Sequence, residues 1–105
     1  MEQPNLLYIK NLSGGDKAFE DKLISIIKKE YPQEKNIYLK NIKALNLEEA
    51  ANNVHKLKHK ISILGLEKSY EIANNFEIKL KDNCLDGQNN FEIILNTITR
   101  FLKTI

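Results

Sequence analysis

Apolar residues recur every three or four positions along almost the whole chain, and no segment alternates convincingly between apolar and polar residues. This spacing is typical of amphipathic helices rather than of strands. It predicts one or two helical turns early in the chain and longer helical segments after them. The predicted helical segments are 6–12, 16–45, 47–64, 66–80 and 89–105.

Several residues mark where these helices bend, begin or end. Pro32 is expected to kink or briefly interrupt the first long segment, because proline lacks the N–H group that continues helical hydrogen bonding. The pattern Asn-x-x-Glu at 46–49 and again at 89–92 resembles a capping box, in which side chains bond the free N–H groups of a helix start. Gly65 suits the left-handed position just beyond a helix end.

One short helix and four longer ones with short connections predict an all-α fold. Amphipathic helices joined by short links favour antiparallel neighbours, and four of them close around one core. We therefore expect an antiparallel up-and-down four-helix bundle with a short additional N-terminal helix. With 105 residues, no internal repeat and no linker-like tract, residues 1–105 are expected to form a single domain.

The composition narrows the class of function. Apolar residues make up 42% of the chain and charged residues 29%, which is the balance of a globular protein. The net charge of +2 is far below the basic excess of a dedicated nucleic-acid binder. No apolar run approaches the roughly 18 residues of a membrane span, and the N-terminus lacks the layout of a signal peptide. The lone cysteine, Cys84, excludes an internal disulfide and suits a reducing compartment, so we expect a cytoplasmic protein.

The candidate chemistry lies in NNVHKLKHKISILG, residues 52–65, which holds both histidines of the chain among three lysines. At about 100° per residue, His55 lies roughly 120° from the centre of the apolar stripe of this helix, and His59 lies farther round. Both rings are expected to face water, while Lys58 lies on the flank of the stripe. The predicted outward face carries Asn52, His55, Lys56, His59, Ser62 and Ile63.

Three interpretations of the two histidines are open on this geometry. Residues four apart can chelate a metal, but Lys-Leu-Lys lies between them and no carboxylate or cysteine is near in sequence. The pair can equally be ordinary solvated surface. Alternatively, the lysines keep an imidazole neutral and nucleophilic and stabilise an arriving phosphoryl group. Phosphoryl transfer asks mainly for positioning and charge stabilisation, and His55 with Lys58 one turn away supplies both.

The run from Val54 to His59, continuing to Leu64 and Gly65, resembles the His-x-Leu-Lys-Gly…Leu-Gly signature of histidine-containing phosphotransfer (HPt) domains. The upstream sequence LLYIKNLSGGDKAFEDKLISIIKKEYP is also similar to the N-terminal half of that family, so the resemblance covers essentially the whole chain. It implies that His55 accepts a phosphoryl group from the aspartate of a receiver domain. It also implies that His55 passes the group to another receiver aspartate in two-component signalling.

The same resemblance assigns roles to the neighbouring residues. Lys58 matches the lysine that lies beside the phosphoryl group, and Gly65 matches a structural glycine at the helix end. His59 is a departure, because the family most often has glycine there; a second imidazole either crowds the receiver or hydrogen-bonds the phosphoryl oxygens. Candidate contacts with the phosphoryl group or the partner are Asn52, Lys56, His59, Ser62 and Ile63.

The resemblance implies a relay rather than a kinase. In histidine-kinase dimerisation helices an acidic residue and then a proline follow the reactive histidine, whereas Lys56 follows His55 here. No nucleotide-binding segment is present either. We therefore expect a phosphocarrier without autokinase activity, with no metal or other cofactor of its own and with Mg²⁺ held by the receiver domain. The expected partners are response-regulator receiver domains and a hybrid sensor histidine kinase, bound by a monomer.

Two other classes of function stand as alternatives. A non-catalytic helical interaction module, a degenerate HPt relative that binds receiver domains without carrying phosphate, is favoured by His59 at the usual glycine position. A weak metal or nucleic-acid binder is disfavoured, because the outward face has no aromatic residues on which bases can stack.

Overall fold

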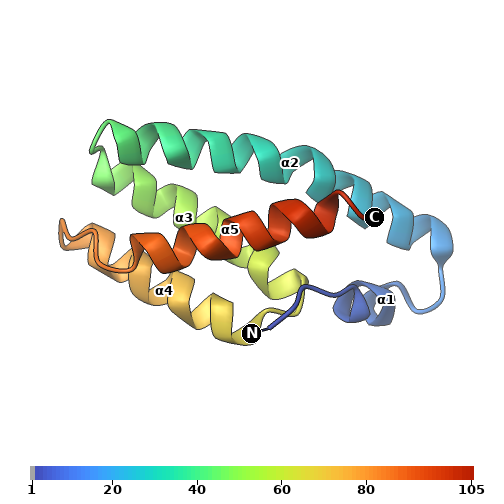
Figure 1. Ribbon diagram of the computed structural model, residues 1–105. Coiled ribbons are helices and arrows are strands. Elements are labelled where there is room, and N and C mark those ends of the chain that lie inside the picture. Colours follow the sequence, from blue (N-terminus) through green and yellow to red (C-terminus); the bar gives the residue numbers. More distant parts are fainter. Residues whose placement is uncertain (1) are drawn as a thin grey trace.

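The computed structural model describes residues 2–105, and every element of regular secondary structure in that range is a helix (Figure 1). The predicted all-α class is therefore confirmed, with one short helix followed by four longer ones. The helices are α1 (Leu7–Ser13), α2 (Lys17–Lys43), α3 (Leu47–Ile63), α4 (Glu67–Lys81) and α5 (Gln88–Leu102). Within residues 2–105, no helix combines the length and the apolar character that a membrane crossing needs.

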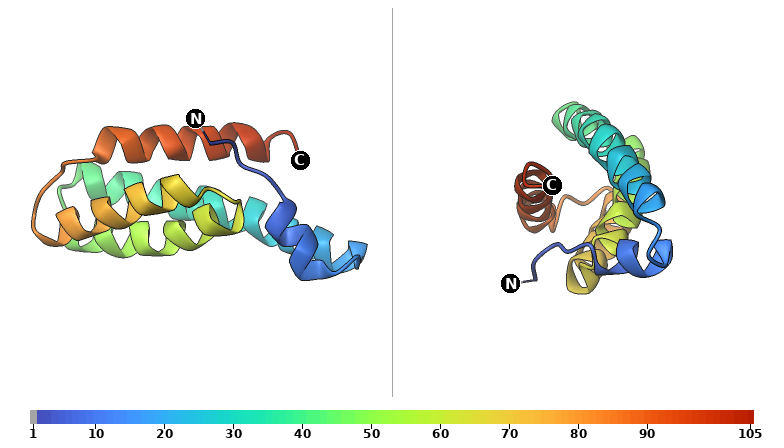
Figure 2. Two further views of the ribbon diagram at one scale, coloured as in Figure 1. Left: turned by 90° about the horizontal axis from the view of Figure 1, so that it is seen from below. Right: turned by 90° about the vertical axis from the view of Figure 1, so that its right-hand side faces the viewer.

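The four longer helices run in alternating directions, and each packs beside the next one in the chain (Figures 1 and 2). Helix α5 also returns to contact α2, and α1 packs on α2. In both figures α1 and the first turns of α2 project beyond the ends of the other helices. The molecule measures 44 × 24 × 19 Å, and its long axis reflects α2, whose 27 residues span about 40 Å at 1.5 Å each.

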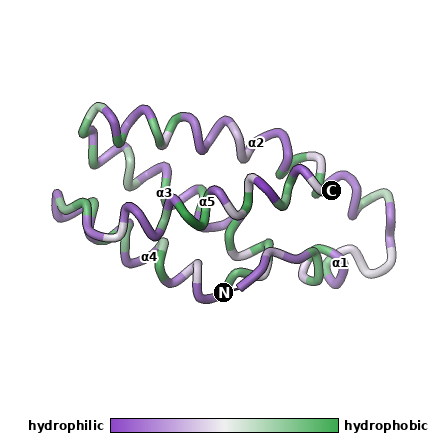
Figure 3. Tube along the Cα trace, viewed as in Figure 1, coloured by the Kyte–Doolittle hydropathy of each residue, from purple (hydrophilic) through white to green (hydrophobic). Residues whose placement is uncertain are grey.

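One apolar core lies between the helices, because each long helix turns its apolar stripe inward. Figure 3 shows hydrophobic and hydrophilic positions alternating along the helices, as this arrangement requires. At the centre, the rings of Tyr38, Phe76 and Phe91 form a cluster whose centroids lie 5.1 to 6.3 Å apart. These rings come from α2, α4 and α5, so the cluster holds three helices together.

Two buried tyrosines also connect α2 to α5 through their hydroxyl groups. Tyr31 donates to the backbone carbonyl of Leu95 at 2.6 Å, and Tyr38 donates to the carboxylate of Glu92 at 3.1 Å. A buried hydroxyl without a partner costs about 1–3 kcal/mol, so these bonds favour one placement of α5 against α2.

The residues before α1 tie the end of α3 to the start of α4. The backbone N–H of Asn5 donates to the carbonyl of Leu64 at 2.9 Å. The carboxylate of Glu2 accepts from the backbone N–H groups of Lys68 and Ser69 at 2.8 and 2.9 Å, supplying a cap that the N-cap residue of α4 does not provide. Burial acts to raise the pKa of Glu2, but the two N–H donors outweigh it and lower that pKa.

Gly65 ends α3 in the left-handed conformation, as the sequence predicted, with φ of +78°. Its N–H donates to the carbonyl of Ser62 at 3.0 Å, and the N–H of Leu66 donates to that of Ile61 at 3.2 Å, which together form a Schellman motif. A Cβ atom at this position would lie 2.6 Å from the amide nitrogen of Asn5. The glycine therefore serves both the turn and the passage of the N-terminal segment.

Some local predictions differ from the structure. Helix α2 continues through Pro32 without interruption, because Pro32 is exposed and water can satisfy the carbonyl that lacks its usual partner. Asn46 is the N-cap residue of α3, but its side chain makes no capping bond. Helix α5 starts after Gly87 rather than at a capping box, and Glu92 bonds Tyr38 and Gln88 instead.

Replacing Gly65 with alanine is expected to destabilise the fold more than the same change at Gly15. Both glycines have positive φ, +78° and +91°, so the backbone strain is comparable, at about 1 kcal/mol. Only at Gly65 does the new methyl group meet another side chain, that of Asn5, whereas open space surrounds Gly15. The exposed Asn5 side chain can turn away only by giving up its bond from the N–H of Leu7, so equilibrium urea unfolding should give Gly65→Ala an additional loss of about 1 kcal/mol. Equal losses would contradict the close passage of the N-terminal segment.

Candidate functional site

His55 lies on α3, and its side chain is 54% exposed, in agreement with the outward position predicted from the periodicity. The ring is nevertheless held by the protein. Its Nδ1 atom lies 3.3 and 3.2 Å from the two carboxylate oxygens of Glu77, which belongs to α4. One edge of the ring is therefore fixed by the neighbouring helix, while much of the side chain is open to solvent.

The contact with Glu77 determines where the neutral ring carries its hydrogen. An ionised carboxylate only accepts hydrogen bonds, so Nδ1 of His55 must be the donor and Nε2 keeps its lone pair. The carboxylate also stabilises positive charge that develops on the ring, as the third member of a catalytic triad does for its histidine. In the neutral ring, Nε2 is therefore the nitrogen whose lone pair stays available to an electrophile.

Glu77 is the centre of this arrangement, and its side chain is only 7% exposed. Its carboxylate lies 3.0 Å from the ammonium group of Lys58 and 3.1 Å from that of Lys81, in addition to its contact with His55. Burial acts to raise the pKa of Glu77, but the hydrogen bonds of Lys58 and Lys81, together with the charges of Lys58 and His55, outweigh burial and lower that pKa. Glu77 is therefore ionised at neutral pH and shares its charge among three partners.

Lys58 points into the protein rather than into solvent. Its side chain is 8% exposed, and its ammonium group donates to the side-chain amide oxygen of Asn74 at 3.0 Å as well as to the carboxylate of Glu77. The ammonium nitrogen also lies 5.4 Å from the centre of the Tyr70 ring, within range of a cation–π interaction. All these partners belong to α4, so Lys58 joins α3 to α4 and reaches His55 through Glu77.

The three lysines near the histidines do not form a positive cluster around the rings. Lys60 is buried and pairs with Glu30 and Glu34 of α2 at 3.1 and 3.0 Å, and Lys58 is paired as described above. Only Lys56 is exposed. The expectation that three ammonium groups surround the imidazoles is therefore wrong, because α2 and α4 bring carboxylates from distant parts of the sequence.

The other predicted residues divide into two groups. Those exposed on α3 are Asn52, Lys56, His59 and Ser62. The ring of His59 meets that of His55 edge to face, with centroids 5.0 Å apart. Ile63, in contrast, is half-buried and packs against the core, so it faces solvent less than predicted. Leu64 and Leu66 are buried in the turn that follows, and the core therefore reaches the last turn of α3.

The two histidines do not belong to a larger set of metal ligands in the described part of the chain. Among residues 2–105, no group of three or more His, Cys, Asp or Glu side chains is arranged to hold a metal ion. The carboxylate nearest to His55 is that of Glu77, which two lysines already engage. Their positive charges would repel a dication at that point.

The partners on α4 were missed by the sequence prediction, although a pattern in the sequence points to them. Glu77 follows Ala73 by four positions and precedes Leu80 by three, so it shares the buried face of α4. A charged residue in such a position is almost never fully buried unless it is paired. Lys58 occupies the same kind of position in the apolar stripe of α3. Opposite charges in the stripes of two consecutive helices predict an ion pair between them.

Comparison of the chain with protein-family models, with curated proteins and with solved structures found no match. The resemblance to HPt domains therefore stays a prediction from the sequence. What the structure contributes is the geometry of His55, Glu77 and Lys58.

Replacing Glu77 with glutamine is expected to lower the free energy of unfolding by about 2–3 kcal/mol at neutral pH. The change removes the counter-charge of Lys58 and leaves a buried ammonium group unpaired. The double variant Glu77→Gln/Lys58→Met should recover part of the loss, because the stranded charge is removed as well. Urea unfolding of the three proteins measures this effect, and a double variant no more stable than Glu77→Gln would contradict a stranded charge.

The pH dependence of stability should change in the same variant. The pKa of Glu77 in the folded protein lies below its ordinary value of 4.5. The ionised carboxylate therefore contributes stability that is present above about pH 4.5 and is lost as the pH falls through the lowered pKa. The difference in unfolding free energy between wild type and Glu77→Gln should shrink as the pH is lowered from 6 towards 3. A difference independent of pH would show that ionisation of Glu77 does not stabilise the fold.

Proposed function

We propose that the protein is a phosphorelay intermediate, which accepts a phosphoryl group on His55 from a receiver-domain aspartate and passes it to another receiver aspartate. The observation that carries the proposal is the exposed imidazole of His55 with its Nδ1 edge held by Glu77. The HPt resemblance supplies the class of partner, and the exposed site suits a phosphoryl group that arrives on another protein. We also propose that the helices form an antiparallel up-and-down four-helix bundle with a short additional N-terminal helix.

The transfer step needs no proton to leave or enter the ring. The lone pair of Nε2 attacks the phosphorus of the aspartyl phosphate, an N–P bond forms as the acyl O–P bond breaks, and the bonding electrons leave with the aspartate carboxylate. His55 keeps the hydrogen on Nδ1, and the phosphorylated ring carries a positive charge. Glu77 lies against that N–H and stabilises the charge. The reverse reaction to a second receiver uses the same contacts.

Lys58 takes a supporting role in this proposal. The resemblance matches it to a lysine beside the phosphoryl group, and its ammonium group is bound to Glu77 and Asn74. In this role Lys58 holds Glu77 in position for its contact with His55. The positive charge of Lys58 also acts at short range on a phosphoryl group at His55. Mg²⁺ belongs to the receiver domain, and the chain supplies neither a nucleotide site nor autokinase activity.

The partner surface in this proposal is the exposed face of α3 around His55. The residues that form it are Asn52, His55, Lys56, His59 and Ser62. Lys56 is the free positive charge among the lysines of this segment, which suits the acidic pocket expected on a receiver domain. Ile63 is less suited to a direct contact than the sequence suggested, because it packs against the core.

The alternative is a non-catalytic module that binds receiver domains without carrying phosphate. The contact between the His59 and His55 rings favours it, because a second ring stands beside the nucleophile where the family most often has glycine. The two functions differ in one measurable property, which is the presence of a phosphoryl group on the protein after contact with a phosphorylated receiver.

His55→Gln is expected to abolish phosphoryl transfer, whereas His59→Gln leaves it in place. The experiment mixes each protein with receiver domains charged from a small phosphodonor and measures acid-labile, base-stable phosphate on the chain. Glutamine removes the nucleophilic nitrogen in both variants, so the pair tests which of the two rings carries the group. Circular dichroism checks that both variants remain helical. Absence of label on the wild type with a panel of receivers, or label that survives His55→Gln, would reject the proposal.

Removing the ring of His59 is expected to increase the rate of transfer several-fold, because that ring occupies space beside His55. His59→Ala and His59→Gly should show the same increase in a time course of transfer from a receiver. The glycine variant alone should also lose about 1 kcal/mol of stability, since glycine is a poor helix residue. Slower transfer in both variants would instead assign His59 a favourable contact with the phosphoryl oxygens.

A further inference from the structure

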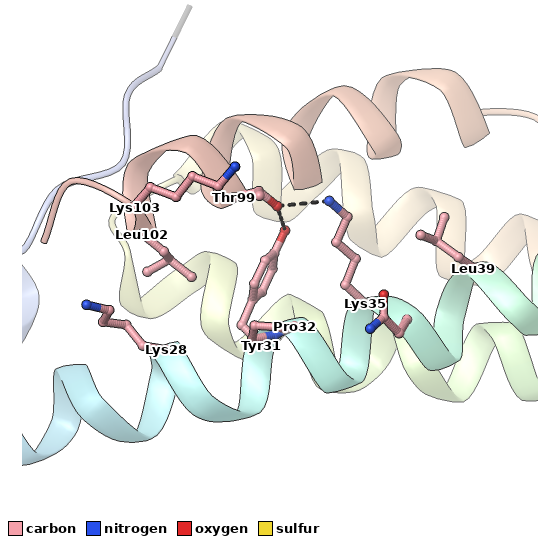
Figure 4. Close-up of a pocket in the computed structure, with 9 residues that line it drawn as sticks. Lys28, Tyr31, Pro32, Lys35, Leu39, Thr99, Leu102 and Lys103 are labelled. Atoms are coloured by element: carbon pink, nitrogen blue, oxygen red, sulfur yellow. Dashed lines mark hydrogen bonds between the residues drawn. The ribbon is translucent and has the colours of Figure 1, made fainter.

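A groove of about 420 Å³ lies between α2 and α5, and none of the residues proposed for phosphoryl transfer lines it. Its apolar wall is formed by Tyr31, Pro32, Leu39 and Leu102. Figure 4 shows these side chains between the two helices, with lysine side chains along the same opening. The volume lies within the range of about 300–1,000 Å³ that is typical of sites for small ligands.

Lys35 places a half-buried ammonium group in this groove. The side chain is half-buried, and its ammonium group donates to the hydroxyl of Thr99 at 2.9 Å. Within residues 2–105, no carboxylate forms an ion pair with Lys35. The other deeply placed ammonium groups, those of Lys58 and Lys60, are each paired with a carboxylate.

A second positive charge stands close to Lys35. Burial lowers the pKa of Lys35, and the charge of Lys103, which follows the end of α5, lowers it further. In Figure 4 the Lys35 side chain extends from α2 to Thr99, and Lys103 lines the same groove. Lys28 lines the groove as well, and its ammonium group donates to the backbone carbonyl of Ile105. The charged residues that line the groove are therefore all positive.

The wall of the groove is fixed in place before any ligand arrives. The hydroxyl of Tyr31 is held by the carbonyl of Leu95 and by Thr99, and burial raises the pKa of Tyr31 to about 12. Its ring is therefore a neutral surface with a fixed position, and Thr99 is shared between this hydroxyl and Lys35. A site with a rigid apolar wall and an uncompensated pair of ammonium groups is complementary to an anion that carries an apolar body.

We propose that the groove between α2 and α5 binds a small organic acid whose carboxylate lies between Lys35 and Lys103, beside Thr99, with its acyl or aromatic body on the exposed Pro32 and Leu39, over the nearly buried Tyr31 and Leu102. Within residues 2–105 neither lysine forms an ion pair with a carboxylate, and the carboxylate of the ligand would supply that partner. The apolar body of the ligand covers the apolar wall of the groove. The site does not depend on phosphoryl transfer at His55, and the two proposals are tested separately.

The proposal is tested by titrating the protein with octanoate while following backbone amide chemical shifts by NMR. We expect saturable shifts confined to the residues near the groove, in α2 around Tyr31 to Leu39 and in α5 around Thr99 to Lys103. Three probes separate the parts of the ligand. Octyl glucoside retains the apolar chain without the charge, acetate retains the charge without the chain, and octylamine reverses the charge. Benzoate distinguishes an aromatic body from an acyl body.

Matched lysine variants test whether Lys35 and Lys103 bind the carboxylate of the ligand. Lys35→Met and Lys103→Met should each weaken octanoate binding by about ten-fold, because each removes one charged hydrogen-bond donor. Lys29→Met is the control, since Lys29 is exposed on α2 and does not line the groove. Circular dichroism and the undisturbed amide spectrum establish that the variants are folded.

The outcomes separate the proposal from its rivals. The proposal is supported if octanoate or benzoate binds while octyl glucoside, acetate and octylamine do not. It also requires that Lys35→Met weakens the binding and that Lys29→Met leaves it unchanged. Equal binding of octyl glucoside or acetate would overturn it, because one half of the ligand would then be unnecessary. Shifts spread over the whole chain, unchanged affinity in Lys35→Met, or no saturable shift with either acid would overturn it as well.

Discussion

The buried ion pair between Lys58 and Glu77 is the interaction on which the rest of the site depends. Neither charge can be left alone at 8% and 7% exposure, because an unpaired buried charge costs several kcal/mol. Helices α3 and α4 must therefore take the separation and rotation that bring the two groups together. The same register sets His55 against the other side of the carboxylate, so helix packing and the tautomer of the histidine are determined by one contact.

The two sides of the molecule are held by different forces. Carboxylate–lysine pairs join α3 to both α2 and α4, whereas α5 is joined to α2 by the tyrosine hydroxyls and one lysine–threonine bond. None of these three bonds pairs a lysine with a carboxylate. Lys35, which lines the groove between α2 and α5, forms no ion pair within residues 2–105. The fold thus separates a charge-compensated face at His55 from an uncompensated one between α2 and α5.

Features of the structure that depend on helical periodicity were predicted correctly from the sequence. Contacts between residues that are distant in the sequence were not predicted. The number of helices, the exposure of His55 and the left-handed turn at Gly65 follow from local rules, and the structure agrees with each. The lysines near His55 were read as free charges because their partners lie far away in the sequence. Ile63 was predicted to face outward because the periodicity of a single helix does not show that the core extends around the end of that helix. Function was inferred from resemblance and stays a proposal.

The ion pair at the site is also local along the chain, because only 19 positions separate Lys58 from Glu77, as their residue numbers show. Contacts between neighbouring helices have a low entropic cost of loop closure, and proteins rich in them fold quickly. The helical hairpin formed by α3 and α4 can therefore assemble before α5 and the N-terminal residues find their places. Glu2 and Asn5 can bind only after that hairpin exists, since their partners are its turn and the start of α4. The contacts around His55 therefore need only a short loop closure, whereas the bonds of Glu2 to the start of α4 join residues that are 66 and 67 positions apart.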